Sequence, residues 1–328
     1  MSITLQKIAK MANVSVSTAS KALRYSKEVH EETAELVRAI AKENGYFLRK
    51  KVVSRQNRTN QALKIALLSP EIISIHYAAM ISKLWEYLTA AGMQVRIFIS
   101  HFNSETTDEI LKRCLEDNDI AGVVSFFSSD EQVDLGFPII MIGESTVYSC
   151  VTSGIDKGVE EAVVALMQRG HSRIAFFGEE LTSKKCEHFK TSLAKHNLPL
   201  YDGAIWMSSE RFEAAGYELM DKLVASGKPL PTAILCAYDE IALGAMRRMH
   251  ELGLNCPDDI SLIGINGIPM AEYSIPALST VRFNEDACCE AVVKLLTDAL
   301  FVKDALPKRM TLKIPYKLII RESVKSLK

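Results

Sequence analysis

The sequence lacks an uninterrupted apolar run of about 18 residues, so it predicts no membrane-spanning helix. Its opening segment, MSITLQKIAKMAN, carries charges where a secretion signal needs apolar residues, so we expect a cytoplasmic protein. The motifs G-x-x-x-x-G-K-S/T, G-x-G-x-x-G, G-x-S-x-G and H-E-x-x-H are also missing. These absences argue against an enzyme, and we expect no cofactor and no metal.

Cysteine is scarce and scattered. The 7 cysteines are odd in number and form no C-x-x-C pair, so they predict buried free thiols in a reducing compartment rather than disulfides or a zinc site. The 7 histidines are interpreted as ordinary surface or capping residues. Neither residue type indicates a catalytic centre.

Charge is unevenly distributed along the 328 residues. Residues 1–58 contain 12 Lys and Arg against 5 Asp and Glu, whereas the remainder contains 27 against 35. The overall formal charge of −1 hides this asymmetry. A basic head on an acidic body indicates that only the head meets a polyanion such as DNA.

The head predicts three short helices. Thr4 is a suitable N-cap for LQKIAKMA, and Ser15 is a suitable N-cap for VSTASKAL after a tight turn. A third helix is predicted over roughly residues 31–44. Its inward-facing residues are expected to be Leu36, Val37 and Ile40.

The second of these helices has the composition of a helix that enters the DNA major groove. Small side chains let it fit the groove, and Ser17 and Ser20 offer hydrogen bonds to bases or phosphates. Val16 is suited to a thymine methyl, and Lys21 to guanine O6 or N7. The arrangement predicts a helix-turn-helix.

The segment TLQKIAKMANVSVSTASKALRYSKEVHEETAELVRAIAKENGY resembles, without a gap, the head of the LacI/GalR family of transcription regulators. The resemblance implies that Val16, Ser17 and Lys21 read bases. Lys21 stands where the family usually has arginine, which suggests softer base discrimination. The further DNA contacts that the resemblance implies are Thr4, Leu5, Ser15, Thr18, Ser20, Arg24, Thr33 and Tyr46.

The basic stretch after Tyr46 predicts a hinge over residues 48–62, following a head of residues 1–47. In the family a leucine of this linker enters the minor groove, and here Arg55 occupies its position. Val52 or Val53 could replace the leucine in a shifted register, or Arg55 could enter a narrow minor groove. A basic tether without fixed structure is the third alternative.

From residue 64 onward, strand-like and helix-like runs alternate, which predicts an α/β core of parallel sheets covered by helices. We expect two doubly wound lobes over residues 63–328. One lobe is expected to combine about 63–155 with 285–312, and the other about 156–284 with 313–328. The strings GHSRIAFFG, AYDEIALGAMRRMHELGLNCPDDISLIGIN and PALSTVRFNEDA resemble the family's periplasmic-binding-protein-like core.

Ligands of such sheets sit beyond the carboxyl ends of the strands. Family members that bind sugars carry Arg, Asn and Asp where this chain has Lys185, Tyr238 and Asn266. The exchanges predict a less anionic and more aromatic pocket in the cleft between the lobes, open to a sugar or to a phosphorylated metabolite. The predicted effector contacts are Ser69, Tyr77, Ser125, Asp156, Lys185, Tyr238, Asn266 and Phe283.

Together these features predict a homodimeric repressor that binds operator DNA and responds to a small effector, with no membrane partner. A dimer is expected rather than a tetramer because no leucine heptad follows the core. Two alternatives remain open: control by a protein corepressor, and a cytosolic solute-binding protein. The second leaves the basic head unexplained.

The charge asymmetry generates a testable prediction. We expect the association constant for duplex DNA to fall steeply with salt, by a slope of roughly 0.9 for each phosphate contacted, because lysines and arginines release counterions from the backbone. A gel-shift titration at increasing salt measures the slope, with the chain lacking residues 1–58 as control. A flat response would contradict a polyanion-binding head.

Overall fold

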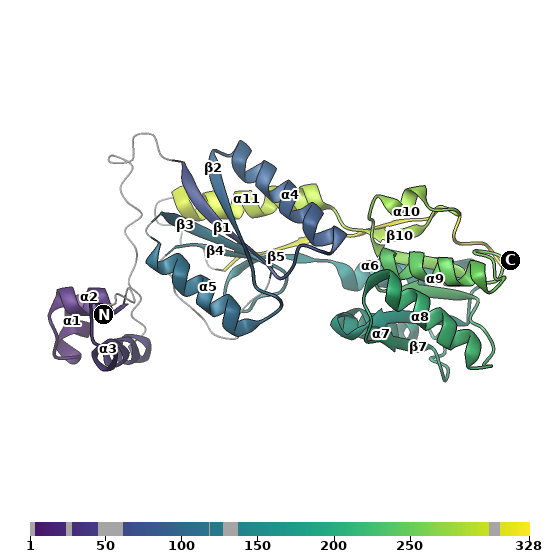
Figure 1. Ribbon diagram of the computed structural model, residues 1–328, viewed down its shortest axis with the longest axis horizontal. Helices are drawn as coiled ribbons and strands as arrows, with labels where there is room; N and C mark the ends of the chain where they lie inside the picture. Colours follow the sequence, from purple (N-terminus) through teal and green to yellow (C-terminus); the bar gives the residue numbers. More distant parts are fainter. Residues whose placement is uncertain (1–3, 24–27, 45–61, 118, 127–136, 302–308) are drawn as a thin grey trace. The chain divides into compact units, whose positions relative to one another are not determined.

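The computed structural model describes residues 4–23, 28–44, 62–117, 119–126, 137–301 and 309–328 (Figure 1). The head consists of α1 (Leu5–Met11), α2 (Val16–Leu23) and α3 (Glu31–Glu43). The hydroxyl of Thr4 accepts from the amide of Lys7, and that of Ser15 accepts from the amide of Thr18, so both predicted caps are confirmed. Asn13, with φ 53°, makes the turn between α1 and α2 in the left-handed region that asparagine tolerates.

Alanines build most of the core of the head. Ala9, Ala12, Ala19 and Ala22 pack with Ile8, Ala34, Val37 and Ala41, so three helices approach closely around few large side chains. The prediction that Leu36 points inward is wrong, since 51% of it is exposed. The small alanines of the third helix fill the space that a leucine would overfill.

The chain forms two compact units, Met1–Thr152 with Glu285–Leu312 (unit 1) and Ser153–Asn284 with Lys313–Lys328 (unit 2). Unit 1 includes the head, so the separate limits predicted for head, hinge and core remain predictions. The predicted class, a helical head with two lobes of mainly parallel sheet, is confirmed. Among the described helices, none is long and apolar enough to cross a membrane.

Unit 1 holds a six-stranded sheet within its described residues, in the order β11-β5-β4-β3-β1-β2. Helices α4 and α11 lie side by side on one face and α5 covers the other (Figure 1). Ala66 and Leu68 of β1 face α5, whereas Ile65 faces the α11 side, as the alternation of a strand buried on both faces requires. The bounds are β1 (Leu63–Ser69), α4 (Ile75–Ala90), β2 (Met93–Ile99), α5 (Ser104–Glu116), β3 (Ile120–Ser125), β4 (Ile139–Ile142), β5 (Ser149–Ser153), α11 (Glu285–Phe301) and β11 (Thr311–Ile314).

Unit 2 holds a second six-stranded sheet, in the order β12-β10-β9-β8-β6-β7, whose pairs are parallel except for β10 with β12. Helix α6 packs with α7, and α8 packs with α9. The bounds are α6 (Ile155–Gln168), β6 (Ile174–Glu179), η1 (Glu180–Thr182), α7 (Ser183–Lys195), β7 (Ile205–Ser208), α8 (Phe212–Ala225), β8 (Ala233–Cys236), α9 (Asp239–Glu251), β9 (Ser261–Asn266), α10 (Met270–Tyr273), β10 (Ser279–Arg282) and β12 (Lys317–Ile319).

The strand-like runs that the sequence shows from residue 64 onward form strands, whereas β5, β11 and β12 were not predicted. These three are short and mix polar with apolar residues, so local pattern does not distinguish them from loops. Strands β11 and β12 lie at sheet edges, where few apolar residues are needed.

One histidine departs from its predicted surface role. His171 is 1% exposed, and its Nδ1 and Nε2 lie 3.0 Å from the Thr232 hydroxyl and 3.1 Å from the Lys325 carbonyl oxygen. Burial lowers the pKa of His171, so the neutral ring donates from Nε2 and fixes the C-terminal segment against β8. The cysteines are free thiols as predicted, and six of the seven are buried.

Two glycines let α8 and α9 cross at backbone contact. A Cβ added to Gly216 would lie 1.8 Å from the carbonyl oxygen of Ile241, and one added to Gly244 would lie 1.9 Å from that of Glu213. Each glycine thus faces the backbone of the other helix. The close crossing fixes the N-terminal ends of both helices, which border the candidate site described below.

We expect Gly244→Ala to lower the free energy of unfolding by about 2–3 kcal/mol, although alanine is the better helix former by about 1 kcal/mol. Thermal and urea unfolding measure the change. Gly92→Asn is the matched control, because Gly92 has open space around its Cβ position and a φ of 77° that asparagine tolerates. A Gly244→Ala protein at least as stable as the parent would show that the two helices separate at little cost.

Candidate functional sites

The DNA-reading face predicted from the sequence is exposed on α2. Val16 is 44% exposed, and Ser17 and Lys21, one helical turn apart, are exposed as well. Ala19 and Ala22 occupy the opposite, buried face. Helix α2 therefore presents polar atoms and one branched apolar side chain on a face that the head itself does not use.

The other predicted DNA contacts surround this face or lie outside the described residues. Thr4 and Ser15 cap their helices, and the Thr18 hydroxyl lies 2.8 Å from that of Ser15. Ser20, Thr33 and Leu5 are half-buried. Arg24, Tyr46, Val52, Val53 and Arg55 lie outside the described residues, and their contacts remain predictions.

Lys21 has a partner that the sequence did not suggest. Its Nζ donates to Oε2 of Glu28, seven residues later and just before α3. This hydrogen bond lowers the pKa of Glu28 below its usual 4.5. The cation expected to meet guanine is therefore held by a carboxylate of its own chain.

At the carboxyl edge of the unit 1 sheet, aromatic rings gather. The ring of Tyr77 meets Phe102 and Phe126 edge-on, at centroid distances of 6.1 and 5.5 Å. Phe102 and Phe126 follow the ends of β2 and β3. Their positions after strand-like runs mark them as candidates for the carboxyl edge, and they were not among the predicted effector contacts. Ser69 donates its hydroxyl to the Glu71 carbonyl, and both Ser69 and Ser125 are almost fully buried. The two predicted serines are therefore buried in this conformation. The half-buried rings of Tyr77, Phe102 and Phe126 provide the accessible surface at this edge.

At the carboxyl edge of the unit 2 sheet, Lys185 and Tyr238 lie together, and their contact with an effector remains a prediction. The Nζ of Lys185 donates to the Ala237 carbonyl over 2.7 Å and lies 4.1 Å from the centroid of the Tyr238 ring. Burial lowers the pKa of Lys185 to about 8, against the opposing effect of Glu240, Asp239 and Glu179. Lys185 is thus engaged by its own chain rather than displayed for an anion.

Sequence reasoning missed the neighbouring pair Arg211 and Phe212. The Arg211 Nε donates to Oε2 of the buried Glu179 over 3.2 Å, and its guanidinium lies 4.3 Å from the Phe212 ring centroid. Phe212 has a φ of 55°, rare for an aromatic residue, and its ring centroid lies 6.1 Å from that of Tyr238. The unusual backbone brings a second ring and a second cation to this edge.

Asp239 holds the loop that follows β9. Fully buried, it accepts from the amides of Gly267 and Ile268 over 2.6 and 2.8 Å and from the Thr280 hydroxyl over 2.6 Å. Burial raises the pKa of Asp239, and these bonds oppose the rise. The loop directly follows Asn266, the last residue of β9, which is 7% exposed and has a φ of 113°.

Glu240 is a second buried carboxyl group at this edge. It is 2% exposed, and its Oε2 has no hydrogen-bond partner among the described residues. Burial raises the pKa of Glu240 to about 7, and the nearby Asp239 and Glu213 add to the rise. When protonated, this group is a hydrogen-bond donor at a site otherwise rich in acceptors.

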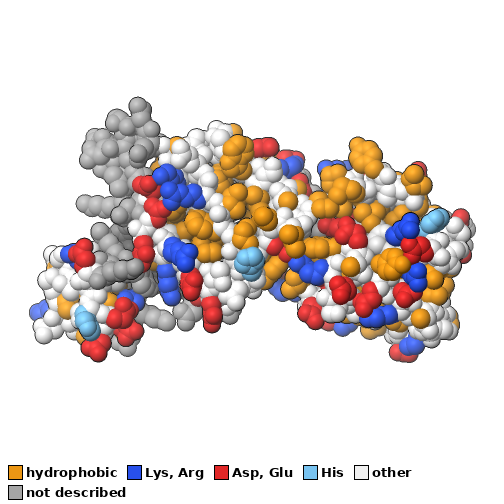
Figure 2. Space-filling model, viewed as in Figure 1, with side chains coloured by type: hydrophobic (Ala, Val, Ile, Leu, Met, Phe, Trp, Pro, Cys, Tyr) orange, Lys and Arg blue, Asp and Glu red, His pale blue; other side chains and the backbone are white. Residues whose placement is uncertain are grey.

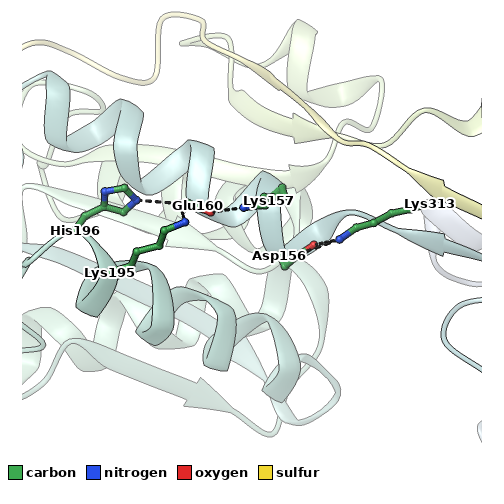
Figure 3. Close-up of polar contacts among 6 residues, drawn as sticks. All are labelled: Asp156, Lys157, Glu160, Lys195, His196 and Lys313. Carbon is green, nitrogen blue, oxygen red and sulfur yellow. Dashed lines mark hydrogen bonds and ion pairs between the residues drawn. The ribbon is translucent and has the colours of Figure 1, made fainter.

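The remaining predicted effector residues, Asp156 and Phe283, make contacts within unit 2. Figure 3 shows Asp156 turned toward Lys313, whose Nζ lies 2.9 and 3.1 Å from the two carboxylate oxygens. Phe283 is 6% exposed and packs on Tyr316 at 5.2 Å. Both contacts therefore stabilise segments of unit 2 that lie next to its boundaries with unit 1 in the sequence. The contact of either residue with an effector remains a prediction.

Further along α6, Glu160 collects three basic groups, as Figure 3 also shows. It accepts from Lys157 and Lys195, and the Nε2 of His196 lies 3.1 Å from its Oε1. These contacts lower the pKa of Glu160 to about 2, so it stays ionised and joins α6 to the end of α7. Across the described residues, no group of three or more His, Cys, Asp or Glu side chains is placed to hold a metal ion.

Comparison with known proteins decides the family. Residues 4–47 match the family described as bacterial regulatory proteins of the lacI family, and residues 163–324 match the periplasmic binding protein-like domain. The chain belongs to the LacI family. It is 28% identical over 342 residues to the HTH-type transcriptional repressor PurR of Mannheimia succiniciproducens, covering 99% of each protein.

Two solved structures share the fold. The lac repressor dimer bound to operator and the anti-inducer ONPF has a TM-score of 0.71 at 20% identity, covering 99% of this chain and 100% of that one. The transcriptional regulator CelR in complex with cellobiose has a TM-score of 0.70 at 20% identity, covering 98% and 99%. LacI-family membership and this fold make the chain a helix-turn-helix transcriptional regulator with a two-lobed core.

The half-buried environment of Lys185 generates a pH prediction. The unfolded chain keeps the lysine protonated up to its ordinary pKa of 10.5, whereas the folded chain releases the proton near 8. Between these values the unfolded state binds more protons, so this group makes the free energy of unfolding rise with pH. Lys185→Met removes that contribution.

Thermal unfolding of the parent and of Lys185→Met, at pH values between about 7 and about 10, measures the difference. We expect the parent to gain stability relative to the variant as pH rises, with Lys184→Met, at an exposed neighbour, as control. Parallel pH profiles for the parent and Lys185→Met would contradict a depressed lysine pKa.

Proposed function

We propose that this LacI-family regulator is a repressor that binds a near-palindromic operator as a homodimer and changes its DNA affinity when a small molecule binds the core. The observation that carries the proposal is the exposed polar face of α2 on a head whose sequence matches the family without interruption. The relatives it matches are transcriptional regulators, and we propose no catalytic activity.

The head supports DNA reading through its geometry. Ser17 and Lys21 lie on one exposed face of α2 with Val16 at the helix start, the positions from which side chains reach base edges in the major groove. The basic residues of the 1–58 segment supply attraction to the backbone. Bases then set the sequence preference and phosphates set most of the affinity.

The effector proposal rests on unit 2. Two rings, Tyr238 and Phe212, stand beside Lys185 and Arg211, and Asp239 fixes the loop that directly follows Asn266. Rings favour a ligand with an apolar face, as a sugar has, and the amide of Asn266 suits hydroxyl groups. Since both cations already have acceptors, we favour a neutral sugar over a phosphorylated metabolite. The CelR complex with cellobiose is consistent with this class of ligand.

Exposed apolar side chains support the dimer. In unit 2, Tyr273 and Ile275 are 81% and 96% exposed, beside the half-exposed Met270. Figure 2 shows apolar side chains standing out in the region of α10. Such residues suit burial against a second copy, and a two-fold dimer matches two half-sites.

Two other functions fit the molecule less well. A solute-binding protein would use the same core but has no role for the exposed face of α2. Control by a protein corepressor needs an exposed docking face, and it predicts that small molecules leave the core unchanged. Both are distinguishable by the experiment below.

The test combines selection and ligand screening. We expect the full chain to enrich two-fold symmetric sequences from a random duplex pool, and the chain lacking residues 1–58 to enrich none, because α2 and the basic residues are removed. A thermal-shift screen of sugars, sugar phosphates and nucleosides should give a hit that both proteins share and that Tyr238→Ala weakens. Enrichment of asymmetric single sites would exclude the dimer, and a full chain that enriches no duplex would exclude the function.

A further inference from the structure

The ion pair between Lys21 and Glu28 lies on the part of the head that the proposed function brings to DNA. The side chains are 48% and 68% exposed, so the pair stands in solvent. An exposed pair of this kind adds little to folding stability. The head core is built from other residues, mainly alanines, and does not involve the pair. Its location therefore points to a role in recognition rather than in folding.

A bonded lysine and glutamate present a donor and an acceptor side by side. The ammonium has three N–H donors, so it keeps two after bonding to Glu28, and the carboxylate keeps acceptor capacity. In the major groove a G·C pair shows the guanine O6 acceptor next to the cytosine N4 donor. The pair on the protein is the complement of that edge. A T·A pair offers thymine O4 and adenine N6 in the same order, but it has the thymine methyl where guanine has its second acceptor, N7. Only guanine therefore accepts from both remaining donors of Lys21 while its partner base satisfies Glu28.

The same carboxylate works against non-specific contact. A lysine alone is a mobile point charge that bonds to any phosphate. With Glu28 attached, moving Lys21 to a phosphate either breaks the ion pair or brings the carboxylate toward backbone charge. The cost falls on phosphate contacts and is absent at a G·C edge, where cytosine satisfies the carboxylate.

Resting on the proposed function, we propose that Glu28 is a specificity-determining residue that acts with Lys21 as one donor–acceptor unit to read a single G·C base pair in each half-site. Lys21 donates to guanine and Glu28 accepts from cytosine N4. The unit restores discrimination that a lone lysine in place of arginine would lack.

The first experiment selects binding sites from a random duplex pool with the full chain and with Glu28→Gln, Lys21→Met and Glu35→Gln. Glu35→Gln is the matched control, since it removes the same charge from an exposed position on α3. We expect one G·C preference per half-site to fall on the order of tenfold in Glu28→Gln and in Lys21→Met, at the same position, and to persist in the control. An unchanged preference in Glu28→Gln, or losses at two different positions, overturns the proposal.

The second experiment measures binding to a random-sequence duplex in a double-mutant cycle. Glu28→Gln should bind this duplex several-fold more tightly, with a salt slope steeper by about 1, because Lys21 is released to a phosphate. In the Lys21→Met background the same substitution should have a much smaller effect. An equal gain in both backgrounds would mean that Glu28 only repels DNA, which also overturns the proposal.

These outcomes separate the two levels of the argument. If the unaltered full chain enriches no duplex, both the proposed function and this inference are wrong. If the unaltered chain enriches a symmetric site and Glu28→Gln enriches the same site with the same preferences, only the role of Glu28 fails. Circular dichroism and thermal unfolding of each variant show that the helices are intact, so a loss of preference is not a loss of fold.

Discussion

The buried carboxylate of Asp239 is the interaction on which the candidate effector edge depends. It joins the start of α9 to the loop after β9 and to β10 through two amides and one hydroxyl. Gly264 makes room for it, since a Cβ there would lie 2.1 Å from the Asp239 Oδ1. A buried charge is tolerated only when it is well bonded. The bonds that satisfy Asp239 are the same bonds that fix the loop directly after Asn266, so the stability of the site and its shape have one cause.

Residue type and spacing along the chain were sufficient to predict the helix caps and most strands and helices. The caps at Thr4 and Ser15, and the alternation of strand and helix in the core, follow from residue type and spacing alone. Leu36 shows the limit, because an apolar residue at helical spacing stays exposed where alanines already fill the core. Strands β11 and β12 show another, because short edge strands are defined by their pairing partners rather than by their own sequence.

The candidate site was predicted in part for the same reason. Lys185 and Tyr238 were predicted from their places in family motifs. Arg211 and Phe212 reach the edge because Phe212 has a positive φ, which residue type and spacing do not predict. Glu28 was missed because it lies seven residues after Lys21 and outside α2, so helical spacing does not pair the two residues. Pairings of this kind depend on tertiary arrangement, and no periodicity marks them.

A common physical feature links the head and unit 2. Lys21 on α2 and Lys185 in unit 2 both stand where a ligand-reading cation is expected, and both are already bonded to acceptors of the protein. A ligand that approaches either lysine must replace an existing hydrogen bond, so simple charge attraction gains little net free energy there. What distinguishes one ligand from another is then whether it also satisfies the displaced acceptor, Glu28 at the head or the Ala237 carbonyl in the core. Holding a cation with an internal acceptor therefore converts a general affinity for anions into a requirement for a matched donor and acceptor.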